Sequence, residues 1–123
     1  MEDWWLSSGH VTSRDTALTT CTDRGSGWYI ATIQSTDDQD WLELCLLSGN
    51  SWVGATDEST EGTWIWEDGT QVADGLRWHN GLPVSSNLKN CVYIKGNGNL
   101  VDDSCMASNR KALCRKTREL LVT

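Results

Sequence analysis

The chain has 123 residues, of which 38% are hydrophobic and 22% are charged, so it is long enough for one hydrophobic core and too short for two ordinary domains. Seventeen acidic and ten basic residues give a net charge of −7, which argues against nucleic acid as a partner because affinity for phosphates requires clustered lysine and arginine. No apolar run approaches the roughly 20 residues that span a bilayer, so we expect no membrane insertion within this chain.

The first predicted element is a helix over residues 13–21. Ser13 is a favourable N-cap and Asp15 places an acidic side chain in the first helical turn. Two glycines in residues 25–27 then interrupt the chain, and residues 28–33 are rich in β-formers. They predict a strand or an extended core segment.

A second helix is predicted behind residues 36–39, whose sequence Thr-Asp-Asp-Gln is typical of a capping box. Apolar residues four positions apart then form one predicted core-facing stripe: Trp41, Leu42, Cys45 and Leu46. Gly49 is a suitable residue to end the helix. We expect Cys45 to be a thiol facing the core, and a link to another chain is the alternative.

The second half of the chain is rich in short β-like runs. They occupy residues 52–55, 63–66 and 91–94, separated by Gly, Asn, Asp and Ser. Residues 67–90 form a long irregular segment that contains several glycines and the single proline. Loops of this length inside a compact domain are usually functional or disordered.

The five cysteines have no C-x-x-C pair and only two histidines accompany them, so neither zinc-ligand spacing nor a redox motif is present. Disulfides formed in an oxidising compartment are the better interpretation, and the odd number leaves one thiol over. Half of the basic residues lie near the C-terminus: Arg110, Lys111, Arg115, Lys116 and Arg118. We interpret them as a solvated strand face and tail, with a patch for an anionic partner as the alternative.

Several motifs, taken in order, resemble those of the C-type lectin-like domain. Residues 52–55 (Trp-Val-Gly-Ala) resemble its W-I-G-L motif, residues 66–69 (Trp-Glu-Asp-Gly) its W-x-D-G turn, and residues 78–83 its W-x-x-G-x-P loop. The resemblance implies an α+β fold in which two helices pack on short antiparallel sheets with a long irregular loop region. It also implies one domain over residues 1–123, with a core at about 5–115 and a tail at 116–123.

The same resemblance implies a disulfide framework. Cys21 is expected to pair with Cys114, and Cys91 with Cys105, which leaves Cys45 as a free thiol. Such a domain is expected to be extracellular or at the cell surface, with any secretion signal outside this chain.

The resemblance also locates a calcium site that this sequence has lost. The first ligand triplet of sugar-binding members reads Leu82-Pro83-Val84 here, the glutamate position is Lys89, and the second triplet reads Leu100-Val101-Asp102. Only Asp102 keeps a ligand side chain, whereas Ca²⁺ requires six to eight oxygen ligands. We therefore expect no calcium and no other cofactor. Lys89 is expected to form an ion pair with Asp102 in its place.

An auxiliary calcium site of some members has two weak candidates here, Asp57 and Glu61. Its remaining ligand positions are Ser85 and Asn90, where carboxylates would be expected. We interpret the segment as an acidic, solvated turn, so no metal is expected there either.

The predicted function is ligand recognition rather than catalysis. His10 and His79 have no linked nucleophile or carboxylate motif, so the chain is not expected to be an enzyme. We expect a calcium-independent module that binds a protein through its long-loop face: Trp78, Asn80, Leu82, Val84, Lys89, Asn97, Asn99 and Asp102. The alternatives are a carbohydrate-binding lectin that uses a non-chelate site with Trp78 as a stacking platform, and a structural or adhesive module of a larger chain.

Overall fold

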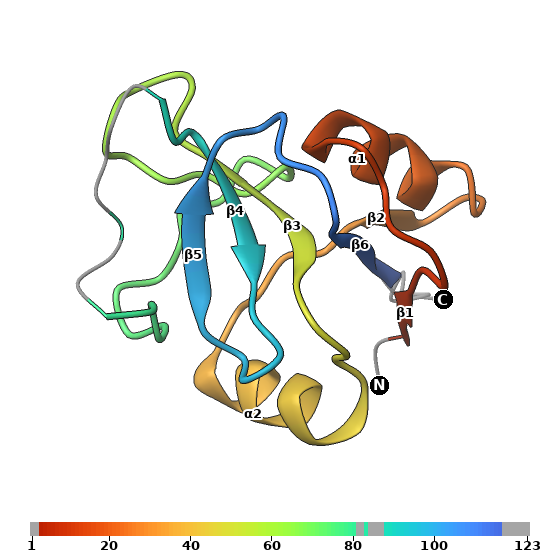
Figure 1. The fold of residues 1–123 in the computed structure, drawn as a ribbon. Helices are drawn as coiled ribbons and strands as arrows, with labels where there is room; N and C mark the ends of the chain where they lie inside the picture. The colour runs from red at the N-terminus through yellow and green to blue at the C-terminus, as the bar shows by residue number, and fades with distance from the viewer. Residues whose placement is uncertain (1–2, 81–82, 84–87, 117–123) are drawn as a thin grey trace, which may run out of the picture.

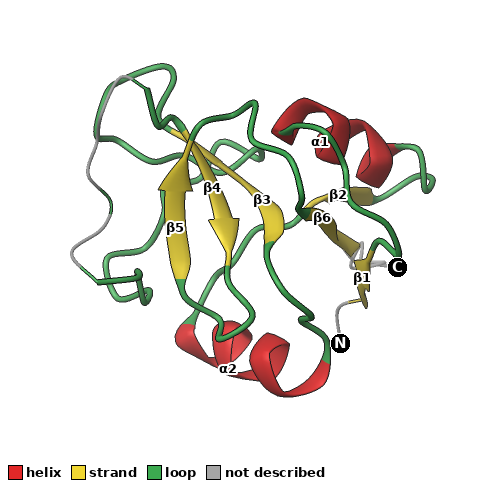
Figure 2. Ribbon diagram, in the orientation of Figure 1, coloured by secondary structure: helices red, strands yellow, loops and turns green. Residues whose placement is uncertain are grey.

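The computed structural model describes residues 3–80, 83 and 88–116. Their helices and strands are, in chain order, β1 (Asp3–Leu6), α1 (Arg14–Thr22), β2 (Trp28–Ile30), α2 (Thr36–Cys45), β3 (Ser51–Thr56), β4 (Cys91–Ile94), β5 (Leu100–Asp103) and β6 (Lys111–Lys116). Neither helix is long and apolar enough to cross a membrane. The architecture is the predicted α+β arrangement of two helices on a sheet (Figure 2).

The sheet is mixed, and β6 joins its two halves. β6 pairs antiparallel with β1 and with β2, and parallel with β3, while β3, β4 and β5 follow as antiparallel neighbours. In Figure 1, α1 lies beside β2 and β6, whereas α2 lies at the end of β4 and β5 where a tight turn joins these two strands. The helices therefore cover different parts of the sheet.

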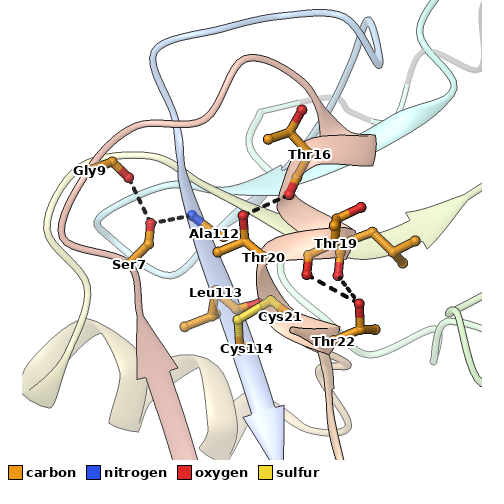
Figure 3. Close-up of a disulfide and its surroundings, with 11 residues drawn as sticks. Ser7, Gly9, Thr16, Thr19, Thr20, Cys21, Thr22, Ala112, Leu113 and Cys114 are labelled. Carbon is orange, nitrogen blue, oxygen red and sulfur yellow. Dashed lines mark hydrogen bonds between the residues drawn. A yellow bond between two sulfur atoms is a disulfide. The ribbon is translucent and has the colours of Figure 1, made fainter. Parts of the chain in front are cut away.

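The first helix forms as predicted. The Ser13 hydroxyl oxygen accepts a hydrogen bond from the Thr16 backbone N–H at 3.2 Å, which caps one of the unpaired amides of the first turn. Ala17 and Cys21 are fully buried. Cys21 forms a disulfide with Cys114 of β6 and so attaches α1 to the sheet (Figure 3). The structure also contains the Cys91–Cys105 disulfide that the resemblance implies.

The second helix begins one residue earlier than the predicted capping box. Ser35 is the N-cap, and its hydroxyl oxygen accepts from the Asp38 backbone N–H at 3.2 Å. The last helical residue is Cys45 and the C-cap is Leu46, so Gly49 lies beyond the helix end rather than at it.

The predicted stripe on the second helix is wrong for two residues. Leu42 is fully buried and Leu46 half-buried, but Trp41 is 45% exposed and Cys45 is exposed. The inner face instead runs through Gln39, Leu42 and Leu46, a spacing of three and then four residues that follows the 3.6-residue helical period. Cys45 is thus the free cysteine, on the outer face of α2.

The β predictions hold in part. Residues 52–55 lie within β3 and residues 91–94 are β4, but residues 28–33 contain only the three-residue β2. Residues 63–66 form no strand, because only Ile65 makes isolated β-bridges there, to Thr56 and Gln71. The two tryptophans beside it, Trp64 and Trp66, are nevertheless buried in the core.

Two of the C-terminal basic residues, Arg110 and Arg115, are not part of a solvated patch, whereas Lys111 and Lys116 are half-buried. Arg115 is buried, and its Nη1 donates to the Thr32 carbonyl oxygen at 2.7 Å and to Asp38 at 3.2 Å. The Arg110 side chain is 11% exposed and donates to Asp103. Arg118 lies outside the described residues. Both arginines are committed to contacts within the domain, so neither of the interpretations drawn from the sequence describes them.

Candidate functional site

A buried glutamine organises the end of the sheet next to α2. Gln39 is fully buried, and its Nε2 donates to the carbonyl oxygens of Arg77 at 2.9 Å and Gly98 at 2.8 Å. Its Oε1 accepts from the Arg77 backbone N–H at 3.0 Å. One side chain therefore joins α2, the segment before the long loop and the turn between β4 and β5. The sequence analysis missed this residue, although its position at i−3 from Leu42 could have revealed it.

Gly98 is required at this junction for steric reasons. Its φ is 86°, a left-handed conformation that favours glycine. A Cβ atom there would lie 2.8 Å from the Gln39 carbonyl oxygen and 3.0 Å from an Arg77 guanidinium nitrogen. The close approach of the turn to α2 therefore depends on the absence of a Cβ atom at Gly98.

Several predicted binding residues lie at this same end. The Asn99 Oδ1 atom accepts from Arg77 Nε at 3.2 Å, and the Asn97 Oδ1 atom accepts from the Asn99 backbone N–H at 3.0 Å. Asn97 is exposed and Asn99 is half-buried. Both asparagines shape the turn between β4 and β5.

Trp78 also belongs to this end of the sheet. It forms a bridge to Leu100, and its ring lies 5.7 Å from that of Trp64 at an angle of 51°. Trp78 is half-buried, whereas Asn80 is exposed. One side of the Trp78 ring is therefore occupied by a protein contact.

The remaining predicted residues that the structure describes lie at the other end of β4 and β5. Asp102 pairs with Val92 near the beginning of β4 and is 2% exposed, whereas Lys89, just before that strand, is exposed. The ion pairs of the described residues do not include Lys89 with Asp102, so this prediction is wrong. Asp102 has interactions of its own. Leu82, Val84 and the auxiliary position Ser85 lie outside the described residues.

The predicted long-loop face is thus divided. The turn between β4 and β5 lies close to α2 (Figure 1), and Trp78 forms a bridge to Leu100 at the start of β5. Asp102 pairs with Val92 toward the opposite end of the two strands, and Lys89 precedes β4 at that end. A small cavity of about 170 Å³ is lined by eight of the described residues: Gly62, Trp64, Gln71, Val72, Ala73, Asp74, Trp78 and Pro83.

The acidic turn after β3 was predicted to be solvated, but one of its carboxyl groups is buried. Asp57 is 2% exposed, and its Oδ2 accepts from the Gly62 backbone N–H at 2.9 Å. Its Oδ1 is buried and has no hydrogen-bond partner among the described residues. The Asp57 backbone N–H donates to the Asn90 carbonyl oxygen at 3.3 Å, which connects this turn to the start of β4.

Glu61 is exposed beside this buried carboxyl group. A hydrogen bond with the Asp57 side chain raises the pKa of Glu61 above its ordinary value of 4.5. Desolvation and the charges of Asp57 and Asp102 act in the same direction, and a hydrogen bond from the Gly62 backbone opposes them. Asp57 and Asp102 therefore both raise the pKa of Glu61 at this end of the sheet.

The described residues do not fit the sugar-type calcium site. Leu100 and Val101 are buried apolar side chains, and Lys89 offers an ammonium group where a carboxylate would bind the ion. Among the described residues, the one group of three candidate metal ligands is Glu58 with Cys91 and Cys105. Those two sulfur atoms form a disulfide and are not thiolate ligands.

Two helices, a mixed sheet and two disulfides around a long loop define a non-enzymatic recognition domain of the lectin type. The family model described as the Lectin C-type domain matches residues 11–116, and the chain belongs to this family. A comparison with the curated proteins finds no match.

Solved structures agree with this assignment. The carbohydrate-recognition domain of cow CD23, determined in the presence of an oligosaccharide, has a TM-score of 0.83 at 25% identity, covering 96% of this chain and 89% of that one. The mouse scavenger receptor C-type lectin domain has a TM-score of 0.83 at 25% identity, covering 98% and 91%. A calcium-independent type II antifreeze protein shares the fold, with a TM-score of 0.82 at 23% identity, covering 94% and 86%.

Proposed function

We propose that the chain is one extracellular or cell-surface recognition domain, spanning residues 1–123 with its core at about 5–115, that binds a protein ligand without calcium. The observation that carries this proposal is the burial of Asp102. It is the one carboxylate left at the sugar-type position, it is 2% exposed, and its strand neighbours Leu100 and Val101 are buried and apolar. A calcium ion and a sugar hydroxyl would both need accessible oxygen atoms there.

The solvent-facing side chains beside this position suit a protein ligand. Leu88 is 81% exposed and is followed by the exposed Lys89. An apolar side chain next to a charge can provide both contact area and orientation in a protein interface. Beneath them, the Cys91–Cys105 disulfide fixes the start of β4. We propose Leu88 as a contact residue that the sequence analysis did not select.

A glycan ligand at a non-chelate site has less support from the geometry. Sugar binding of that kind needs an open aromatic face, and Trp78 is half-buried against Trp64. The cow CD23 structure was determined with an oligosaccharide. At 25% identity, and with the calcium ligands replaced here, we do not carry that ligand over to this chain.

The test is a binding screen on two arrays, one of purified extracellular protein domains and one of glycans, each probed in calcium and in EDTA. We expect a protein to be bound equally in both buffers. Leu88→Asp should weaken this binding by about tenfold or more, since it places a charge in an apolar contact. Met106→Asp is the matched control, because Met106 is 75% exposed on a different loop. Binding to glycans alone, or binding that EDTA removes, would reject the proposal.

A second candidate, a structural or adhesive module, is favoured by the outer face of α2. Cys45 is an exposed free thiol, and Leu44 beside it is 83% exposed. Trp41, on the same helix, is 45% exposed and stacks on Trp4 with the ring centres 6.2 Å apart. A thiol within an exposed apolar surface is a plausible site for a covalent link to another chain.

Glutathione disulfide tests this candidate by thiol–disulfide exchange. Two Cys45 thiols and one glutathione disulfide would give one intermolecular disulfide and two glutathione molecules. The module predicts a covalent dimer on a non-reducing gel that is absent for Cys45→Ser. A product that stops at the mixed disulfide with glutathione would count against a link between two copies.

A further inference from the structure

A second concave surface lies between α1, β2 and the turn at Trp66–Gly69. In Figure 1, α1 and β2 lie on the side of the molecule opposite β5. The cavity has a volume of about 610 Å³ and is lined by nine residues: Leu18, Thr22, Tyr29, Ile30, Thr32, Gln34, Glu67, Asp68 and Arg115. Ligand sites in proteins commonly have volumes of about 300–1,000 Å³, so this groove is large enough to hold a ligand group.

The two long walls of the groove are apolar. Tyr29 on β2 is 51% exposed, and Leu18 on α1 is half-buried. Ile30 also lines the groove, and its side chain is fully buried and belongs to the core. Burying the exposed part of Tyr29 against an apolar ligand group would be favourable, because tyrosine combines a large apolar face with a polar tip.

The rim of the groove carries acidic groups. Asp68 Oδ1 accepts from the Thr70 backbone N–H at 2.9 Å and from the Thr70 hydroxyl at 2.6 Å, and its second oxygen has no partner among the described residues. Glu67 is 40% exposed and accepts from Arg14 at 2.6 Å through one of its two oxygens. Arg14 itself is buried, so the carboxylate is the more accessible part of this pair.

The helical side of the groove adds no net negative charge. The carbonyl oxygens of Thr19, Cys21 and Thr22 accept from the N–H groups of the residues that follow α1, and the cation Arg24 lies directly after Asp23. Among the described residues that line the groove, the cation Arg115 is already engaged with Asp38 and with the Thr32 carbonyl, and lies over the Trp4 ring at 4.3 Å. A cationic ligand is therefore attracted by the acidic rim at Glu67 and Asp68.

We infer that this groove is a second binding site, which takes a short basic and amphipathic peptide segment of a partner protein. An apolar side chain of the segment packs against Tyr29 and Leu18, and a neighbouring lysine or arginine faces Asp68. The complementarity of charge selects the partner, because an acidic segment would be repelled by the same groups. This inference is independent of the calcium-free site proposed at the long loop.

Fluorescence anisotropy with a labelled hexapeptide of alternating leucine and lysine tests the inference. We expect saturable binding that weakens as salt is added, and none by a leucine–glutamate or a serine–lysine peptide. Asp68→Asn keeps the oxygen that bonds Thr70 and should raise Kd about two- to fivefold, as for an exposed ion pair. Tyr29→Ser should raise Kd about tenfold, because it removes the apolar wall. The matched control is Asp74→Asn, an exposed carboxylate outside the groove, which should leave Kd unchanged.

Thr22→Arg keeps the test decisive if Tyr29→Ser fails to fold. Thr22 is exposed on α1, and arginine there adds bulk and a like charge at the mouth of the groove without removing any core contact. It should abolish peptide binding while the melting temperature stays the same. Absence of binding to the wild-type domain, equal loss with Asp74→Asn, or binding that survives Thr22→Arg would overturn the inference. A concentration-dependent dimer that Thr22→Arg dissolves would assign the groove to a second copy and would also overturn it.

Discussion

The two ends of the β4–β5 strand pair contain different kinds of buried polar side chain. At the end next to α2, the neutral amide of Gln39 is fully buried and makes three hydrogen bonds to backbone atoms of Arg77 and Gly98. At the other end, Asp57 and Asp102 are buried carboxyl groups, and Glu61 lies beside them. The buried side chain at the first end is neutral and fully bonded, whereas the buried side chains at the other end are carboxyl groups.

This difference indicates which end is structural and which is suited to ligand chemistry. A buried amide whose donors and acceptor are all used stabilises one conformation and offers little to a ligand. A buried carboxyl group that raises the pKa of a neighbouring one and has an oxygen without a partner among the described residues is typical of a site, or of the remains of one. If the loop binds no calcium, as we propose, this end of the sheet nevertheless remains acidic.

The largest effect on stability is expected at the end next to α2. Gln39→Leu preserves helix propensity and approximate volume but leaves two carbonyl oxygens and one N–H without their partner. Each buried polar group left unsatisfied costs about 1–3 kcal/mol, so we expect a total loss of about 2–4 kcal/mol in unfolding free energy after relaxation. Urea denaturation measures it. Gln71→Leu, at an exposed position, is the control and should change stability by less than about 0.5 kcal/mol. Equal effects of the two variants would show that the junction is not structural.

A smaller loss is expected for Gly98→Ala. Alanine at a φ of 86° is strained, and its Cβ atom would lie 2.8 Å from the Gln39 carbonyl oxygen. The left-handed conformation alone costs about 1–2 kcal/mol. Gly75→Ala provides the comparison, since nothing lies within 4 Å of its Cβ position. Thermal melts of both should separate them, and an unchanged melting temperature for Gly98→Ala would contradict the close approach of the turn to α2.

At the acidic end, the expected effect is a small gain. Because the pKa of Glu61 is raised in the folded state, the folded domain binds this proton more tightly than the unfolded chain does. Stability is therefore lost as the pH rises above 4.5 through the folded pKa. Glu61→Gln should raise the melting temperature slightly at pH 7 and have no such benefit below pH 4. Glu58→Gln removes the same charge from an exposed neighbour and should give less. Equal gains would attribute the effect to net charge alone.

Local patterns in the sequence predicted much of the fold, and particular residues show where they stop. Ser13 as an N-cap, the motif at Trp52 and the implied cysteine pairing all appear in the structure. The helical period is compatible with a buried face on either side of Leu42, and one of these faces includes Trp41 and Cys45. Periodicity over ten residues therefore did not decide which face is buried. Only packing against the sheet does so.

Buried polar side chains were the main misses. Gln39, Asp57 and Arg115 have polar side chains that usually face solvent. Gln39 and Arg115 are bonded to backbone atoms distant in sequence, and Asp57 to the Gly62 N–H in the turn that follows it. The division of the predicted binding residues between two ends has the same origin. Residues close together in the chain, such as Asn99 and Asp102, are separated by the length of β5.

A thermal melt of the wild-type domain in millimolar calcium and in EDTA tests calcium independence most directly. A site with Kd tenfold below the calcium concentration would stabilise the folded state by about 1.4 kcal/mol. For a domain of this size that is a shift of several degrees in melting temperature. We predict no shift, because Leu100, Val101 and Lys89 provide no oxygen ligands at the sugar-type position. A clear upward shift would contradict the account. Its loss in Asp57→Asn would then place the ion at the auxiliary position, and its loss in Asp102→Asn at the sugar-type one.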